Sequence, residues 1–319
     1  MGYFDGRLII MLRFNYLKVL FCSVALCIAA LGASAQVVEI NRDFSSFDAI
    51  DVSYDFNVRM VSSRKNYSAT LTVDSVLADY IQTYVKKNVL YITIDKKSLP
   101  SEVKKLYKGR KAVVPILNVV VSTPEPICSF KLADKSTLSV ENVLNCKDFS
   151  ISLNGLSRLK KLELDATNVS VNLADKSQAE FDVNAESLEI SASGSSSAYI
   201  SHNSEHLALN TTSNADLELE GQTLVAEVKA DGASKTCIKG KTGELIVNGS
   251  GHANIDAINL RTSNATVKLS GTCKLTEAAT EKLNIEMSGY SSLVFDGDPV
   301  INIVNIKTSS VSRYEEGKK

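Results

Sequence analysis

Tryptophan is absent from this 319-residue chain, and aromatic residues make up only 7% of it. The chain also lacks an excess of positive or negative charge, because its formal net charge is only -1. A near-neutral chain has no field that would attract a polyanion, which argues against a nucleic-acid partner. Hydrophobic residues nevertheless reach 44%, enough for a large core. Ser, Asn, Val and Leu dominate the second half, a usage typical of short strands joined by tight turns.

The common catalytic motifs are missing as well. The sequence contains no G-x-S-x-G elbow, no P-loop and no H-E-x-x-H motif, and it lacks the calcium-binding G-G-x-G-x-D repeat. Its three histidines are His202, His206 and His252. The spacing of His202 and His206 suits a metal only on a helix, whereas the surrounding residues indicate a loop, so we interpret both as surface histidines. We therefore predict no catalytic, cofactor-binding or metal-binding residues, and no cofactor.

The N-terminus has the pattern of an export signal. An apolar run over residues 17–31 follows Arg13 and ends before the small-residue sequence Ala33-Ser34-Ala35. The run is shorter than the 18 or so residues of a membrane-spanning helix, which favours a cleaved signal peptide over an anchor. We predict cleavage between Ala35 and Gln36, no transmembrane segment in the mature chain, and export to the periplasm, outer surface or medium. Met11 begins a more ordinary signal peptide than Met1 does.

Four cysteines remain after signal removal: Cys128, Cys146, Cys237 and Cys273. An even number in an exported protein allows disulfide bonds without requiring them. Because no pair has C-x-x-C or metal-finger spacing, we favour buried free thiols over bridges.

A short turn phrase returns through the second half of the chain. Each copy is a Gly or Ser turn followed by a short apolar strand, and the copies lie about 20 residues apart, a period typical of repeat architectures. Glycine tolerates the tight backbone conformations that such turns need. We predict that the turn glycines are structural: Gly155, Gly194, Gly232, Gly249, Gly271 and Gly289.

The repeat predicts an all-β chain folded as a right-handed parallel β-helix, with two strands in each coil of about 20 residues. Within one strand, Leu283, Ile285 and Met287 alternate with polar residues, so one set can stack in a core. A two-sheet sandwich is the main alternative, but it does not require such even spacing. Ser, Thr and Asn residues recur at the bends, where their side chains could hydrogen-bond to carbohydrate hydroxyls. Hydrogen bonds to the backbone of neighbouring bends explain the same residues without a ligand.

Residues 36–126 follow a different pattern and would cap one end of the repeats, which occupy residues 127–312. Alternating apolar and polar residues predict several strands, with further strands over residues 89–94 and 113–121. Apolar residues at helical spacing predict one short helix over residues 76–86. Residues 313–319 form a charged C-terminal tail, and residues 1–35 are the signal peptide.

A basic loop lies between the strands predicted over residues 89–94 and 113–121. Its cationic residues are Lys96, Lys97, Lys104, Lys105, Lys108, Arg110 and Lys111. Such a loop could meet an acidic glycan or a lipid headgroup. A solvated loop that keeps the strand connection soluble is the simpler interpretation.

Two carboxylates stand in twin Leu-Ala-Asp-Lys-Ser phrases, at Asp134 and Asp175. We expect them at the same place in consecutive coils, beside Lys135 and Lys176, as a ladder of compensated charges. The competing interpretation is an acid–base pair of a polysaccharide lyase or hydrolase. A β-helix alone does not decide between them.

Residues 44–58, the segment 89–94 and the Ser-Gly-x-Ser turns together resemble the putative auto-transporter adhesin, head GIN domain family. This family occurs in secreted proteins of Bacteroidetes and has no agreed active residue. The resemblance implies a β-helix and a binding or structural role at the cell envelope, with a glycan or envelope component as partner. We therefore predict a non-catalytic protein, with a carbohydrate-active enzyme as the alternative; the oligomeric state is left open.

Overall fold

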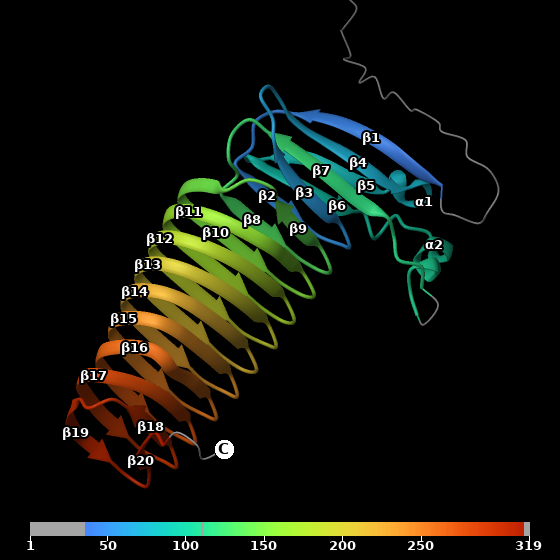
Figure 1. Cartoon of the computed structure of the whole chain (residues 1–319). Helices are drawn as coiled ribbons and strands as arrows, with labels where there is room; N and C mark the ends of the chain where they lie inside the picture. Colours follow the sequence, from blue (N-terminus) through green and yellow to red (C-terminus); the bar gives the residue numbers. More distant parts are fainter. Residues whose placement is uncertain (1–35, 110–111, 316–319) are drawn as a thin grey trace, which may run out of the picture.

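Parallel pairing between successive repeats organises the second half of the chain. In the computed structural model, which describes residues 36–109 and 112–315, each long strand pairs in parallel with the next one along the chain. These strands are β11 (Arg158–Leu173), β12 (Gln178–Ala192), β13 (Ser197–Thr211), β14 (Asp216–Ala230), β15 (Lys235–Gly249), β16 (Asn254–Leu269) and β17 (Lys274–Met287). They form one elongated stack (Figure 1). The prediction of an all-β β-helix is confirmed.

Each long strand bends near its middle and contributes two rows to the interior. In β14, Leu217 and Leu219 are buried before the bend, and Ala226 and Val228 are buried after it. Glu218 and Glu227, which alternate with these residues, are exposed, as the alternation of a strand requires. Because equivalent positions pair from coil to coil, these apolar residues form continuous columns along the stack.

The first coils of the stack come from the N-terminal segment. β2 (Ala49–Val52) and β3 (Asn57–Ser62) pair in parallel with β8 (Ser129–Leu132) and β9 (Thr137–Val140). On their other side lie β6 (Val89–Ile94) and β7 (Leu117–Thr123), again in parallel. The strand ladder therefore continues across residue 126 without a break. The sequence did not reveal this, because β3 and β9 are far apart in the chain.

Antiparallel strands complete the N-terminal end. β1 (Val37–Phe44) pairs with β4 (Tyr67–Asp74), β4 pairs with β7, and β5 (Ile81–Lys86) pairs with β6. The predicted helix over residues 76–86 is wrong, because α1 covers only Ser75–Ala78. Residues of β5 alternate between buried and exposed positions, and pairing with β6 overrides their helical spacing.

The segment between β6 and β7 is longer than the other corners and holds a second helix, α2 (Ser101–Leu106). The strand expected from residue 113 begins only at Leu117. Residues 113–116 therefore belong to the loop. Figure 1 shows α2 beside the antiparallel cap, at the end of the stack far from β19.

Sharp corners with left-handed backbone stack on one another between coils. Gly155, Gly194, Gly232, Gly271 and Gly289 lie at these corners with φ between 70° and 73°. Asp134, Asp175 and Ser213 take the same conformation at theirs.

The turn predicted at Gly249 is wrong by two residues. Gly251 has φ 64° and occupies the corner, whereas Gly249 is the last residue of β15. A Cβ on Gly249 would lie 2.5 Å from the Cys273 sulfur, so this glycine makes room inside the core. The phrase around it contains two glycines, and only the strand register distinguishes them.

Within residues 36–109 and 112–315, no strand covers the C-terminal end of the stack. β17 pairs with β19 (Val300–Ile306), and β18 (Ser292–Asp296) pairs with β20 (Ser310–Arg313). Apolar residues of β19 are exposed because no described strand lies beyond them. Arg313, expected to begin the charged tail, is the last residue of β20, and residues 316–319 lie outside the described part. The signal peptide and its cleavage site between Ala35 and Gln36 also involve residues outside it.

One pair of cysteines contradicts the expectation of free thiols. Cys128 and Cys146 form a disulfide whose Cα atoms lie 6.0 Å apart. Cys146 belongs to β10 (Leu144–Leu153), which pairs with β8 next to Cys128, so the coil brings the two together. Cys237 and Cys273 are free thiols.

Candidate functional site

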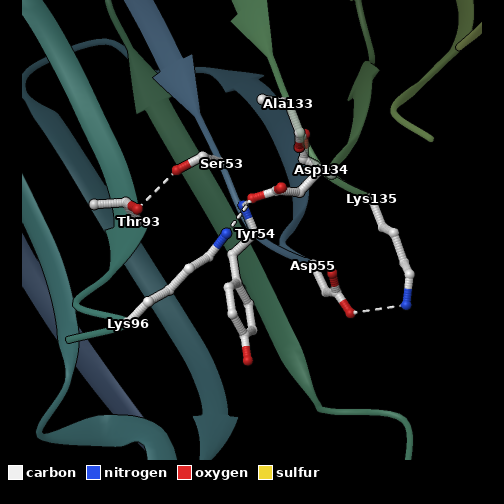
Figure 2. Close-up of polar contacts among 9 residues, drawn as sticks. Ser53, Tyr54, Asp55, Thr93, Lys96, Ala133, Asp134 and Lys135 are labelled. Atoms are coloured by element: carbon white, nitrogen blue, oxygen red, sulfur yellow. Dashed lines mark hydrogen bonds and ion pairs between the residues drawn. The ribbon is translucent and has the colours of Figure 1, made fainter. Parts of the chain in front are cut away.

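Lys96, the first cation of the basic loop, has a structural role. Its Nζ lies 2.8 Å from Oδ2 of Asp134 and 5.4 Å from the centre of the Tyr54 ring. Figure 2 shows these side chains meeting at the corner between β2 and β3. Lys96 therefore fastens the start of the loop to the stack and is not a free cation.

The two twin-phrase aspartates act as clamps between corners. Asp134 Oδ2 accepts a hydrogen bond from the backbone N–H of Tyr54 at 2.9 Å, and Asp175 Oδ2 accepts one from Gly155 at 2.9 Å. The hydrogen bond from Lys96 lowers the pKa of Asp134, and the Tyr54 N–H adds to this effect. Both carboxylates are thus bound to the corner of the preceding coil.

The expected placement of these aspartates in consecutive coils is wrong. Gly155 occupies the corner between them, so Asp134 and Asp175 are two coils apart. The expected pairing of Asp134 with Lys135 is also wrong, because Lys135 lies 3.6 Å from Asp55 (Figure 2). Adjacent residues at a sharp corner point in different directions, which the linear sequence does not display.

The far end of the basic loop is fixed by Asp74. The Tyr107 hydroxyl donates to Asp74 Oδ2 at 3.2 Å, and the backbone N–H of Ile116 donates to the same oxygen at 3.1 Å. Burial raises the pKa of Tyr107 to about 12, with a further contribution from the Asp74 charge. Tyr107 is therefore a neutral donor at physiological pH, and the loop is held at both ends.

The remaining cations of the loop differ in accessibility. Lys97, Lys105 and Lys108 are exposed and Lys104 is half-buried, whereas Arg110 and Lys111 lie outside the described residues. Exposed aliphatic side chains accompany them: Leu106, Val113 and Val114. The charge pattern does not reveal these apolar residues, because the sequence predicts Val113 and Val114 as part of a strand over residues 113–121 and not of the loop.

A second candidate surface lies on the outer face of β11 to β14. It is a shallow groove of about 700 Å³ in which the Tyr199 side chain, 42% exposed, stands among polar residues. The polar groups that line the groove include Arg158, Lys161, Gln178, Glu180, Asp216 and Glu218. The Tyr199 hydroxyl lies 3.4 Å from Oε2 of Glu220. Sequence reasoning missed this groove because its residues come from four repeats.

Two buried titratable groups lie outside both surfaces. His202, expected on a surface loop, is instead buried inside β13, where burial lowers its pKa to about 4 and its Nδ1 contacts the Ser204 hydroxyl at 3.1 Å. His202 is buried because the segment is a strand and not a loop, and because its side chain lies at an inward-facing position of that strand. Glu277 is fully buried in β17, and burial raises its pKa to about 8, with a smaller contribution from Asp296.

Neither a metal site nor a membrane-spanning helix is found in the described part of the chain. Within residues 36–109 and 112–315, no three His, Cys, Asp or Glu side chains gather as a metal site would require. None of the helices in those residues has both the length and the apolar composition needed to cross a bilayer.

Stacked parallel coils with an antiparallel cap define a β-solenoid protein. The chain matches the family model described as putative auto-transporter adhesin, head GIN domain, over residues 46–202 and 189–299. It therefore belongs to this family, as the resemblance in the sequence predicted.

Two solved structures are similar to the chain over most of its length. A protein from Parabacteroides distasonis described as a putative lipid binding protein is 15% identical, with a TM-score of 0.47, covering 88% of this chain and 97% of its own. A putative adhesin from Parabacteroides merdae is 13% identical, with a TM-score of 0.45 and coverages of 88% and 96%. No curated protein matches the chain.

Proposed function

We propose that this protein is a non-catalytic binding protein of the cell envelope, and that it holds a glycan in the groove around Tyr199. The single observation that supports this most is the groove itself, where one exposed aromatic ring stands among charged and amide side chains. Membership of an adhesin family agrees with a binding role.

The chemistry of the groove suits a sugar. Sugar rings offer apolar C–H faces that pack on an aromatic ring, and their hydroxyls both donate and accept hydrogen bonds. Arg158 and Gln178 provide donors beside Tyr199, while Glu180 and Glu218 provide acceptors. A shallow groove on a rigid sheet requires little rearrangement on binding, which favours recognition of an extended chain.

The same geometry disfavours the enzyme alternative. Asp134 and Asp175, the carboxylates considered for acid–base catalysis, are engaged by backbone N–H groups of neighbouring corners. Neither lines the Tyr199 groove. A lyase or hydrolase would instead have to use the carboxylates that line the groove, Glu180, Asp216 and Glu218.

An envelope location is part of the proposal. The family implies an extracellular or envelope protein. The disulfide between Cys128 and Cys146 agrees with an oxidising compartment, as does the predicted export signal over residues 1–35. Labelling of intact cells would place the protein on the outer surface, whereas labelling only after permeabilisation of the outer membrane would place it in the periplasm.

A glycan panel tests the proposal. The mature protein, beginning at Gln36, is incubated with neutral and acidic polysaccharides, and both binding and release of reducing or unsaturated ends are measured. We expect binding without release. Release of such ends would instead establish an enzyme, whether it is abolished by Asp134→Asn or Asp175→Asn or by Glu180→Gln or Glu218→Gln in the groove.

A further inference from the structure

Exposed aliphatic side chains lie on four segments that adjoin one another at the N-terminal end of the molecule. We name this surface the aliphatic patch, and it consists of Val37, Val76, Leu106, Val113, Val114 and Ile116, all exposed. Val114 is the most exposed of them, at 84%. Single exposed apolar residues are ordinary, but a group of this size at one place signals an interaction surface.

Backbone hydrogen bonds hold the four segments together. The Val113 N–H donates to the Leu106 carbonyl at 2.9 Å, which joins the two sides of the basic loop. The Asp74 N–H donates to the Ile116 carbonyl at 3.0 Å, and the Ser75 N–H donates to the Gln36 carbonyl at 2.8 Å. These bonds bring β1, α1 and the end of the basic loop side by side.

Cations flank the α2 side of this patch. Around α2, Lys104, Lys105 and Lys108 are opposed by one acidic residue, Glu102, although the chain as a whole carries a net charge of -1. The patch therefore combines aliphatic side chains with a local excess of positive charge. An anionic surface with an apolar interior is complementary to both properties.

We propose that the aliphatic patch docks the protein onto an anionic lipid bilayer. Leu106, Val113 and Val114 enter the boundary between headgroups and acyl chains, while Lys105 and Lys108 contact lipid phosphates. Long lysine side chains can keep their ammonium groups at the headgroups while their methylenes lie along the apolar surface. This inference goes beyond the glycan groove, which lies further along the stack on β11 to β14 (Figure 1).

The composition of the patch favours lipid over a protein partner. Protein interfaces are enriched in aromatic residues, Met and Arg, and depleted in Lys. The described part of the patch has Val, Leu and Ile with Lys beside them. The loop is also fixed at both ends, by Lys96 on Asp134 and by Tyr107 on Asp74, so it is presented without a large cost of ordering.

The absence of tryptophan permits a direct test. Val114→Trp places a single fluorescent reporter in the patch, and Leu224→Trp places one at a matched site, 62% exposed, on β14. The mature proteins are titrated with vesicles of phosphatidylglycerol or of phosphatidylcholine. We expect a blue shift only for Val114→Trp and only with phosphatidylglycerol. Equal shifts in the two variants, or no shift in either, would contradict the proposal.

Vesicle sedimentation of the protein without added tryptophan completes the test. Lys105→Gln combined with Lys108→Gln should weaken binding to phosphatidylglycerol vesicles by roughly 30-fold, and high salt should weaken it further. Val113→Asn with Val114→Asn should abolish it, while Leu224→Asn should not change it. Retained binding in the patch variants would overturn the proposal. So would a patch-dependent dimer in size-exclusion chromatography of a protein that does not bind vesicles.

Discussion

Gly251 lies directly against Gly232 of the preceding coil: a Cβ built on Gly251 would meet the backbone N and O of Gly232 at 2.9 Å. The His252 N–H donates to the Gly232 carbonyl at 2.6 Å, so the corners are bonded as closely as the strands. The corner column is therefore a continuous element of backbone that fixes the spacing of the coils.

Substitution at this corner should destabilise the fold. Gly251→Ala introduces a side chain at φ 64° and a contact under 3 Å, and we expect a loss of about 2 kcal/mol or more in unfolding free energy. Denaturant unfolding measures this loss. Gly251→Asn should cost less than Gly251→Ala because Asn tolerates left-handed backbone. Equal stability of the alanine variant and the wild type would contradict the assignment of the corner.

The clamp at Asp175 gives a second prediction. Asp175→Ala removes the acceptor for the Gly155 N–H and places Ala in left-handed backbone, so we expect a loss of about 2 kcal/mol. Asp175→Asn keeps an acceptor oxygen and should cost less than half as much. If the two variants unfolded at the same denaturant concentration, the hydrogen bond between the Gly155 N–H and the Asp175 side chain would not contribute to stability.

The disulfide should stabilise the first coils. Replacing both Cys128 and Cys146 by Ser opens a loop whose ends are 18 residues apart, which we expect to cost about 3 kcal/mol. Cys273→Ser is the matched control for loss of a cysteine. Cys273 occupies the buried small-residue position two residues after a corner, where Ser234 and Ser291 stand in other coils. A double variant as stable as this control would rule out a structural role for the bridge.

Because Glu277 is buried, we expect the stability of the fold to fall as the pH rises. Its pKa is raised to about 8 in the folded protein, so the folded state holds a proton that the unfolded state loses from about pH 4.5. The stability contribution is complete below that value and is lost as pH rises through about 8. Thermal unfolding between pH 5 and 9 should therefore show a decline that Glu277→Met removes. An identical pH profile for both proteins would contradict the burial of a neutral carboxyl.

The architecture was largely predictable from the sequence because the same local residue types recur once in every coil. A corner needs Gly, Asp or Ser every 19 or so residues, and each strand needs alternating apolar residues, so Gly194 and Leu283 already indicate their positions. The sequence does not decide whether Gly249 or Gly251 occupies the corner, since a shift of two residues preserves the alternation of the strand. The helix predicted over residues 76–86 was wrong because pairing with β6 decides that segment.

The candidate surfaces were less predictable for a physical reason. Tyr199 and Arg158 line one groove only because of the register of the coils, and the segments that carry Val37 and Val114 are joined only by backbone hydrogen bonds within the folded cap. Charge alone identified the basic loop, yet Lys96 proved to be bound to Asp134. Sites assembled across repeats require the register, which a single sequence does not specify residue by residue.

Calorimetric titration of the mature protein with a glycan identified by the panel tests the central claim most directly. Tyr199→Ala should weaken the affinity about tenfold, because the ring that packs on the sugar is removed. Tyr290→Ala is the matched control, since Tyr290 is 76% exposed at a corner outside the groove and should leave the affinity unchanged. Equal affinities of Tyr199→Ala and the wild type, or a loss in Tyr290→Ala alone, would contradict the account.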